Sequence, residues 1–257
     1  MLCAAVAVTA GERLRICEEV SEWAPFSFVE SASPGTDATA PLAGFSLDVL
    51  RAMQLPYEDI EVQALPWLRC LAEVEQGTRY QLSLSASIKP GREARFLFSR
   101  PYYTTRLHYF YRVDRHPDLA EIEAAAQLGR WRVCGIHGHA YAGLDLDRSR
   151  INQGVRTVTD LFRLLHLGRC DVVLSQIEIV RGHALTGRGV LLAPDVAHAL
   201  VPGVPVERYH MLVSRRWPQG ETLRAQIDTA LERLQRSGEL ARIRARWGLE
   251  DDAWAAE

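Results

Sequence analysis

The sequence predicts an α/β fold that is built from two similar units. Short strand-like runs alternate with stretches of helical periodicity in both halves of the chain, and this alternation favours parallel or mixed sheets. The composition, with 47% hydrophobic and 24% charged residues, is typical of a soluble globular protein with a substantial core. A length of 257 residues accommodates one large domain or two small ones.

The first unit reads as strand, helix, strand, helix and strand. Apolar residues at helical spacing predict its first helix, and Gly77 marks the end of the second. Residues 23–29 are interpreted as a partly exposed aromatic segment, and residues 31–41, rich in Ser, Pro, Gly and Thr, as a loop. The predicted elements are, in order, residues 14–17, 44–53, 60–65, 68–76 and 82–87.

A strand-like run at residues 107–113 interrupts this pattern, and a second α/β unit follows it. A further strand at residues 209–213 resembles that run in length and texture, and it leads into two C-terminal helices within residues 222–247. Chain crossings near residues 104–107 and 205–209 therefore predict two lobes joined by a double hinge. The predicted elements between the crossings are a helix at 118–128, a strand at 130–136, a helix at 158–167, a strand at 171–175 and a helix at 177–183.

The charge and the apolar patterning exclude two classes of partner. A net charge of -2 leaves no electrostatic footprint for nucleic acid, and no apolar run approaches the length of a membrane span. Residues 1–10, MLCAAVAVTA, resemble the end of a secretory signal that closes in small residues near Ala10, although a basic start is lacking. A short N-terminal strand or a disordered tail is the alternative interpretation.

Five cysteines are present, and four remain if Cys3 leaves with a signal peptide. Four cysteines in an exported protein permit disulfides in three pairings. The CxxC spacing that would indicate a zinc site does not occur. The positions of the four near the ends of predicted elements favour Cys17 with Cys70 and Cys134 with Cys170. Free buried cysteines remain an alternative.

Residues 82–103, LSLSASIKPGREARFLFSRPYY, carry the strongest functional signal. An alternating strand ends in the hydroxyl groups of Ser85 and Ser87, and a Lys-Pro-Gly turn then delivers Arg92 to the head of a short helical stretch just beyond the strand end. Open α/β sheets bind ligands beyond the carboxyl ends of their strands, and the planar guanidinium suits a carboxylate. The alternative is a surface arginine in a helix-capping turn.

This segment resembles the signature of the bacterial family 3 solute-binding proteins, the periplasmic amino-acid-binding components of ABC transporters. That signature reads "T-I-T-x-x-R … F-S-x-P-Y", and the chain has SIKPGR at 87–92 and FSRPY at 98–102. Residues 44–49 and 240–247 resemble the family's "G-F-x-x-D-L" and "L-x-x-I-x-x-K-W", and the order of elements is similar over 13–249. The resemblance implies a bilobed, type II periplasmic-binding-protein-like fold, with lobe 1 formed by residues 11–104 and about 210–257 and lobe 2 by residues 105–209.

The resemblance also implies a ligand site on the first lobe. Arg92 takes the ligand's α-carboxylate in this comparison, and Ser85 and Ser87 add hydrogen bonds. Trp23 and Trp67 correspond to aromatic residues that stack on the ligand side chain, which buries much area at little cost in rotamer entropy. Loop tryptophans that cap the core are the alternative for both.

On the second lobe, Gly138 matches a turn that places backbone N–H groups at a helix start, ready for an anion, although His139 replaces the usual hydroxyl residue. Ser175 and Gln176 stand at a strand end, and Gln176 replaces an aspartate that usually holds the α-ammonium group. A buried ammonium needs a compensating charge. The candidates for that charge are Glu178, Glu18 and Glu19; otherwise the ligand has no α-ammonium group.

The function implied is that of a non-enzymatic periplasmic binding protein. It captures a small carboxylate, an amino acid or a related acid, by lobe closure and delivers it to an inner-membrane ABC permease. A monomer without cofactor or metal is expected. Two alternatives stay open: an enzyme similar to cyclohexadienyl dehydratase with Glu178 or Glu19 as general acid, and a ligand sensor that works through a separate receptor.

Overall fold

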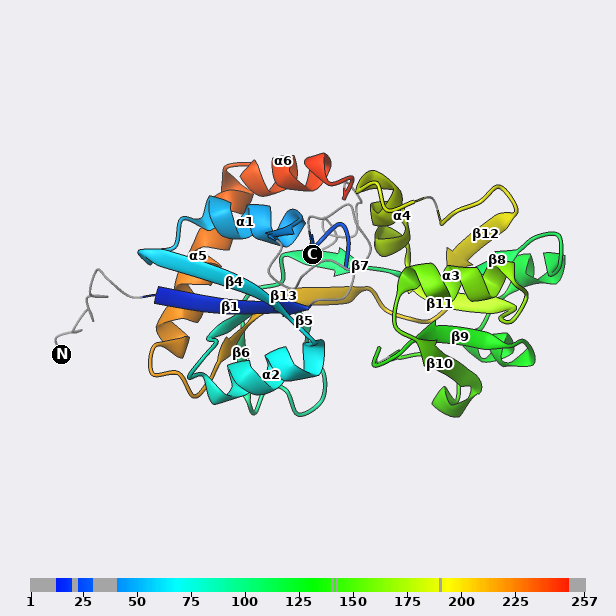
Figure 1. Cartoon of the computed structure of the whole chain (residues 1–257), viewed down its shortest axis with the longest axis horizontal. Helices are drawn as coiled ribbons and strands as arrows, with labels where there is room; N and C mark the ends of the chain where they lie inside the picture. Colours follow the sequence, from blue (N-terminus) through cyan, green and yellow to red (C-terminus); the bar gives the residue numbers. More distant parts are fainter. Residues whose placement is uncertain are drawn as a thin grey trace. The chain divides into compact units, whose positions relative to one another are not determined.

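The chain folds into two compact units in the computed structural model (Figure 1). The structure describes residues 13–19, 23–29, 41–139, 141, 143–189 and 191–249. The first unit takes its described residues from 1–20, 26–102 and 209–246, and the second from 21–25, 103–208 and 247–257. The sequence assigned residues 23–25 and 247–249 to the first lobe, whereas their contacts group them with the second unit.

The first unit is built on a mixed sheet with the strand order β4-β1-β5-β13-β6. The strands β4, β1 and β5 run parallel, while β13 is antiparallel to both β5 and β6. A small antiparallel pair, β2 with β3, accompanies the sheet. The bounds are β1 Arg13–Glu19, β2 Phe28–Val29, β3 Leu42–Ala43, β4 Asp59–Leu65, β5 Leu82–Ser87, β6 Phe96–Phe98 and β13 Glu207–Ser214.

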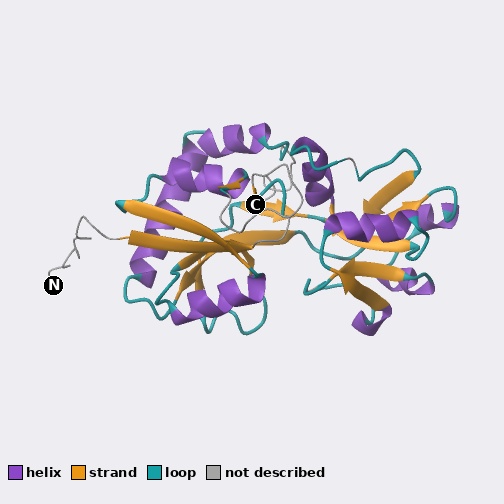
Figure 2. Ribbon diagram, in the orientation of Figure 1, coloured by secondary structure: helices purple, strands orange, loops and turns teal. Residues whose placement is uncertain are grey.

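Helices cover both faces of this sheet. The helix α2 lies on one side, and α1, α5 and α6 lie together on the other (Figure 2). Their bounds are α1 Phe45–Met53, α2 Trp67–Gln76, α5 Gly220–Arg236 and α6 Glu239–Arg246. On the α2 side, a disulfide joins Cys17 of β1 to Cys70 of α2, and it lies within a cluster of buried residues that also contains Val74, Tyr80, Ala86, Phe96 and Leu212. The sheet thus has an apolar, disulfide-linked face toward α2.

The second unit is built on a sheet with the strand order β10-β9-β11-β8-β12. The strand β9 runs parallel to β10 and β11, and β8 runs antiparallel to β11 and β12. A short strand, β7 (Tyr103–Thr105), precedes β8. The remaining bounds are β8 Leu107–Arg112, β9 Val133–Ile136, β10 Ile151–Val155, β11 Val172–Gln176, β12 Val196–Leu200, α3 Val158–His166, α4 Ile177–Leu185 and a 3-10 turn at Arg148–Arg150.

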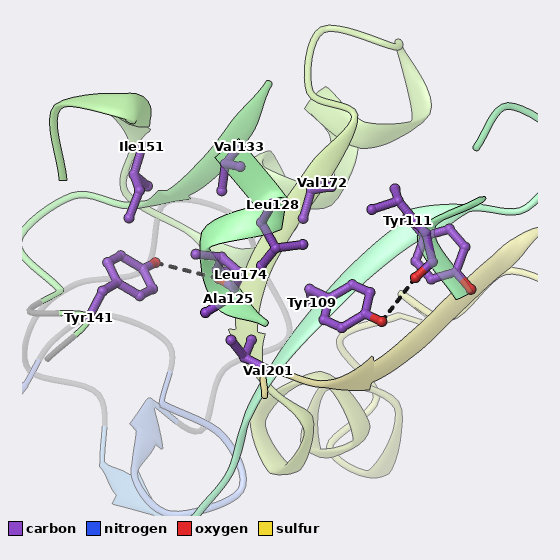
Figure 3. Packing of buried hydrophobic residues seen from close by; sticks show 11 residues of the cluster. Tyr109, Tyr111, Ala125, Leu128, Val133, Tyr141, Ile151, Val172, Leu174 and Val201 are labelled. Atoms are coloured by element: carbon purple, nitrogen blue, oxygen red, sulfur yellow. Dashed lines mark hydrogen bonds between the residues drawn. The ribbon is translucent and has the colours of Figure 1, made fainter. Parts of the chain in front are cut away.

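Alternation along β8 divides the core of the second unit into two sides. Phe110 contacts Phe162 of α3, with ring centroids 5.1 Å apart, while Tyr109 and Tyr111 stack on each other on the opposite face. The Tyr109 hydroxyl donates to the Leu119 carbonyl, so the polar end of a buried ring is satisfied. Figure 3 shows the cluster on this face, which consists of Tyr109, Tyr111, Leu119, Ala125, Leu128, Val133, Tyr141, Ile151, Val172, Leu174 and Val201.

The predicted helix at residues 118–128 is wrong, because the chain forms two short 3-10 turns there, η1 (Pro117–Glu121) and η2 (Ala125–Arg130). Ile122 between them is extended, with φ -75 and ψ 117. The side-chain oxygen of Gln127 accepts hydrogen bonds from the N–H groups of Glu123 and Ala124. This side chain caps a new turn and so competes with continuation of the first one.

Other expectations differ in detail. The strands β2, β3, β6, β7, β10 and β12 were not predicted separately, and each is only two to five residues long. Residues 24–28 are buried rather than partly exposed, and only Trp23 and Val29 at the two ends of that segment are half-buried. Among the helices that the structure describes, none is long and apolar enough to cross a membrane.

Candidate functional site

The strand β5 presents a row of hydroxyl groups on one face. Ser83, Ser85 and Ser87 alternate with apolar residues, so their side chains share one side of the strand, and all are buried. Buried hydroxyl groups need hydrogen-bond partners. Ser85 Oγ lies 3.4 Å from the Oγ of Ser46 in α1, and Ser83 Oγ donates to Glu18 at 3.4 Å. The side of the strand away from its apolar residues is therefore a polar layer inside the first unit.

Glu18, near the end of β1, lies at the centre of this layer and has no exposed surface. Its Oε2 accepts from the Leu84 N–H at 2.8 Å, and its Oε1 accepts from Ser27 Oγ at 3.2 Å. Burial raises the pKa of the Glu18 carboxyl to about 7, although these hydrogen bonds oppose the shift. Sequence reasoning considered Glu18 only as an ammonium partner. The missed signal is that Glu18 falls on the same face of β1 as Leu14 and Ile16, which places a carboxyl group on a buried side.

Tyr102 completes the layer from the other end of the signature segment. Its hydroxyl lies 2.7 Å from the Leu84 carbonyl and 2.8 Å from Ser46 Oγ. Because a carbonyl can only accept, the tyrosine proton goes to Leu84 and the serine donates to the tyrosine. The ring stacks on Phe45 at 5.7 Å, and burial raises the pKa of Tyr102 well above its usual value. Tyr102 therefore ties α1 to β5 as a neutral group.

Arg92 stands at the end of β5, close to two of the other predicted site residues. Its Nη1 donates to the Ser87 carbonyl at 2.9 Å, and its Cζ lies 5.6 Å from the ring centroid of Trp67, the first residue of α2. Residues 91–95 form a turn rather than the predicted helical stretch. The turn is closed by the Arg92 carbonyl, which accepts from Phe96 N–H at 2.9 Å, and Gly91 adopts a φ of +81 that only glycine takes freely. The arginine is thus held beside β5 by both its backbone and its side chain.

In the second unit, Trp23 packs in an aromatic group instead of standing alone in a loop. Its Nε1 donates to the Tyr103 hydroxyl at 3.1 Å, and its ring meets His139 edge-on, with centroids 5.7 Å apart. The His139 ring lies 6.2 Å from that of Tyr141. Burial lowers the pKa of His139 to about 4, so the imidazole is neutral near pH 7 and acts here as an aromatic side chain.

The prediction of a helix start at Gly138 is wrong. No helix begins in the described residues 137–139, 141 and 143–147, and Gly138 lies in a turn with a φ of +80. The N–H of His139 donates to the Ile136 carbonyl, and the Gln153 amide donates to the carbonyls of Ile136 at 3.1 Å and His139 at 3.0 Å. The Gln153 side chain therefore bridges the two ends of the turn, and the turn does not present the N–H groups of a helix N-terminus to an anion.

Three predicted residues meet where β11 passes into α4. Ser175 is 1% exposed, and within the described residues its Oγ has no hydrogen-bond partner; Gln176 is the N-cap of α4. The Glu178 carboxylate accepts from the Arg106 N–H at 3.1 Å and lies 3.9 Å from the Arg106 side chain. A ligand ammonium group would therefore share Glu178 with an arginine. Glu19, the other charge candidate of the predicted site, is half-buried at the last position of β1.

The four cysteines form the preferred pairs, Cys17 with Cys70 and Cys134 with Cys170. Both members of each pair are buried. In the part of the chain that the structure describes, no three His, Cys, Asp or Glu side chains come together as a metal site would require.

The chain matches the family model of the bacterial extracellular solute-binding proteins, family 3, over residues 16–250. No curated protein matches it. Among solved structures, an amino acid ABC transporter substrate-binding protein, AbpA from Streptococcus pneumoniae bound to L-arginine, is similar with a TM-score of 0.70 and 20% identity, covering 93% of this chain and 95% of that chain.

Two further structures share the fold. An ABC uptake transporter substrate-binding protein from Streptococcus pneumoniae with bound histidine has a TM-score of 0.68 and 18% identity, covering 91% of this chain and 92% of that one. The ancestral amino acid-binding protein AncCDT-1, described as a precursor of cyclohexadienyl dehydratase, has a TM-score of 0.65 and 17% identity, covering 91% and 95%. At these identities the similarity establishes the bilobed type II architecture of the fold.

Proposed function

The chain belongs to the bacterial extracellular solute-binding proteins, family 3, and from this membership we propose that it captures a small carboxylate, an amino acid or a close relative, in the periplasm. It then delivers the ligand to an inner-membrane ABC permease. The observation that carries the ligand class is the position of Arg92. A guanidinium held at the carboxyl end of β5, beside Ser87 and over the Trp67 ring, is the donor arrangement that a carboxylate needs.

The first unit supplies a prepared half of the site. The Ser87 carbonyl and the Trp67 ring hold the arginine, so little rotamer freedom is lost when a ligand binds. Ser85 and Ser87 are 9% and 7% exposed at the end of the strand, with hydroxyl groups on the polar face. Structures of the same fold with bound arginine and histidine support an amino acid as the ligand.

The residues of the second unit suggest that affinity depends only weakly on the ligand's α-ammonium group. Gln176 offers an amide where an aspartate is expected, and Glu178 is already paired with Arg106. A neutral amide compensates a buried ammonium charge less well than a carboxylate does. We therefore expect small discrimination between an amino acid and the same acid without its amino group, and we expect Gln176→Asp to increase that discrimination.

Binding to the purified protein tests the proposal. The protein is unfolded and refolded with its disulfides intact, to remove carried-over ligand, and is screened by thermal shift against the twenty amino acids, small dicarboxylates and prephenate. A ligand present at a hundredfold its Kd stabilises the folded state by about 2.7 kcal/mol. Hits are then titrated by calorimetry with wild type, Arg92→Ala and Arg92→Lys.

Arg95→Ala is the matched control, because Arg95 lies three residues away in the same turn and forms an exposed ion pair with Glu75. Loss of Arg92 is expected to weaken binding by roughly 30-fold or more, as for removal of one partner of a desolvated charge pair. Arg92→Lys keeps the positive charge but not the planar, two-pronged guanidinium, and its affinity should lie between those of wild type and Arg92→Ala. Equal affinity of wild type and Arg92→Ala would refute the site. Turnover of prephenate would favour the dehydratase alternative instead.

A further inference from the structure

We propose that Glu18 is a positioning residue that couples ligand affinity to pH by holding the strand β5, which carries Ser85 and Ser87. The proposal rests on the function proposed above, because it concerns the same half-site. Glu18 has no exposed surface and does not reach a ligand itself. It acts through the main chain of Leu84, the residue directly before Ser85.

The backbone pairing shows where Glu18 acts: β13 pairs with one edge of β5, and Glu18 lies on the other edge, toward β1. The parallel ladder between β1 and β5 holds a single residue pair, Ile16 with Leu82. Two residues further along both strands, the Glu18 carboxylate accepts the Leu84 N–H at 2.8 Å. A side chain therefore holds β5 where the ladder to β1 has stopped, immediately before the residues of the half-site.

The other contacts of this part of β5 extend the same support. The Leu84 carbonyl accepts from the Tyr102 hydroxyl at 2.7 Å, so the N–H and the carbonyl of Leu84 are both held by buried side chains. Ser85 is tied to Ser46 of α1, and the Ser87 carbonyl accepts from Arg92. Hydrogen bonds thus connect Glu18 to Ser85 through Leu84, Tyr102 and Ser46, and the strand itself joins Ser85 to Ser87, whose carbonyl holds the guanidinium that is proposed to bind the carboxylate.

Protonation changes what Glu18 can do in this network. The ionised carboxylate only accepts, and its contacts with Leu84 N–H, Ser27 Oγ and Ser83 Oγ are all with groups that can donate. A protonated carboxyl must donate from one oxygen, so one serine has to turn and accept, and the charge that strengthens the Leu84 contact is lost. The ionised form therefore holds β5 more firmly than the neutral form.

The groups around the Glu18 carboxyl determine the pH range over which it ionises. Tyr102 faces it as a neutral phenol, the Ser85 and Ser27 hydroxyl groups stabilise the ionised form, and the adjacent Glu19 opposes ionisation by its negative charge. Burial, with a smaller contribution from Glu19, raises the pKa of Glu18 to about 7, against 4.5 for an ordinary glutamate, although the hydrogen bonds from Leu84, Ser85 and Ser27 lower it. A change in the strength of the Leu84 contact is thus expected between pH 6 and 8, on the order of one unit either side of that pKa.

Two measurements on the whole protein test the proposal, and the first needs no ligand. The amide resonance of Leu84 is followed by NMR from pH 5 to 9 in wild type and in Glu18→Gln. The side chain introduced by this substitution is not ionisable, yet its amide oxygen can still accept from Leu84. A Leu84 shift that titrates near pH 7 in wild type and is flat in the variant is expected. A Leu84 resonance that does not titrate in wild type overturns the proposal.

The second measurement is the Kd of the tightest ligand from the amino acid screen, at pH 6 and pH 8. Wild type should bind roughly five- to tenfold more tightly at pH 8, which is the lower end of the usual coupling between two sites. Glu18→Gln should bind equally at both values, and Glu18→Leu weakly at both. Glu61→Gln on the neighbouring strand β4 is the control and should keep the wild-type profile.

The outcomes separate this inference from the function on which it rests. A titrating Leu84 amide with an affinity that is independent of pH, or tighter at pH 6, overturns the coupling while leaving the proposed function intact. A pH-dependent affinity that persists unchanged in Glu18→Gln also overturns it, because another group must then titrate. If no amino acid or related acid binds at any pH, the proposed function fails and the coupling fails with it, even where Leu84 titrates.

Discussion

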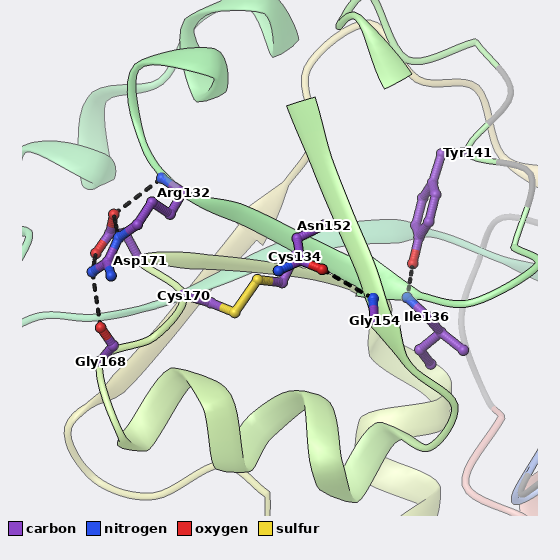
Figure 4. The surroundings of a disulfide bond; sticks show 9 residues. All are labelled: Arg132, Cys134, Ile136, Tyr141, Asn152, Gly154, Gly168, Cys170 and Asp171. Carbon is purple, nitrogen blue, oxygen red and sulfur yellow. Dashed lines mark hydrogen bonds and ion pairs between the residues drawn. A yellow bond between two sulfur atoms is a disulfide. The ribbon is translucent and has the colours of Figure 1, made fainter. Parts of the chain in front are cut away.

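Replacement of Cys134 and Cys170 together by alanine removes the disulfide that ties β9 to Cys170, two residues before β11 begins (Figure 4). The bridge closes a loop with a sequence separation of 36 residues. For a loop of that length, the bridge lowers the conformational entropy of the unfolded chain and so stabilises the folded state by about 4 kcal/mol at 25 °C. For a chain of this size, such a loss should lower the melting temperature by roughly 8–16 °C.

The assay is chemical denaturation followed by circular dichroism, with three samples compared. The three samples are oxidised wild type, the double variant and reduced wild type: the double variant opens only the loop closed by Cys134 and Cys170, whereas reduction also opens the one closed by Cys17 and Cys70. Both cysteines are about 1–2% exposed, so the variant also loses buried sulfur contacts, but it keeps the second bridge and should lie between oxidised wild type and the reduced protein in stability. The matched variant without Cys17 and Cys70 opens a separation of 53 residues and should lose a similar amount.

A thiol titration of the unfolded protein shows which samples contain the disulfides. Five cysteines are present, so the non-reduced chain should show one thiol, that of Cys3, and the reduced chain five. One thiol together with equal stability of oxidised wild type and the double variant would refute the loop-entropy argument. Five thiols without reductant would refute the pairing itself.

Three further predictions concern single residues. Glu18→Gln should flatten the pH dependence of stability: the raised pKa of the wild-type carboxyl, about 7 against 4.5, means that stability falls as pH rises from 4.5 through 7, by about 3 kcal/mol. Urea midpoints at pH 5 and 8 measure this, and an unchanged slope in the variant would contradict it. Asp171→Asn should lower the free energy of unfolding by about 1–2 kcal/mol above pH 4, a small value because the partner Arg132 is largely exposed. Arg132 holds the pKa of Asp171 at about 2, so wild type loses this stabilisation as the pH falls from 4 to 2. Thermal melts of the two proteins should therefore converge over that range. Gly182→Ala should cost about 1–3 kcal/mol, because a Cβ there would lie 2.5 Å from atoms of Pro25, and an unaltered melting temperature would show that Pro25 does not pack on α4.

The sequence by itself determined the features that depend on local periodicity. Alternation along residues 82–87 placed Ser85 and Ser87 on one face of a strand, and the Lys-Pro-Gly turn placed Arg92 just beyond it. The helices α1, α2, α3, α4, α5 and α6 all lie where the sequence predicted a helix. The family, the type II fold and the class of binding protein were implied by the resemblance of residues 44–49, 87–102 and 240–247 to family motifs, and the family match over residues 16–250 confirms the family.

Only the tertiary structure decided the partners of buried polar groups. The Glu18 carboxyl meets Leu84, 66 residues away, and the Tyr102 hydroxyl meets Ser46, 56 residues away; both contacts depend on strand order and helix packing. The turn at Gly138 is closed by Gln153, which replaces the predicted helix start. Periodicity reports which side of an element a residue occupies, but the group that meets it there comes from a distant segment. For that reason the hydrogen-bond network behind the half-site was not visible in the sequence.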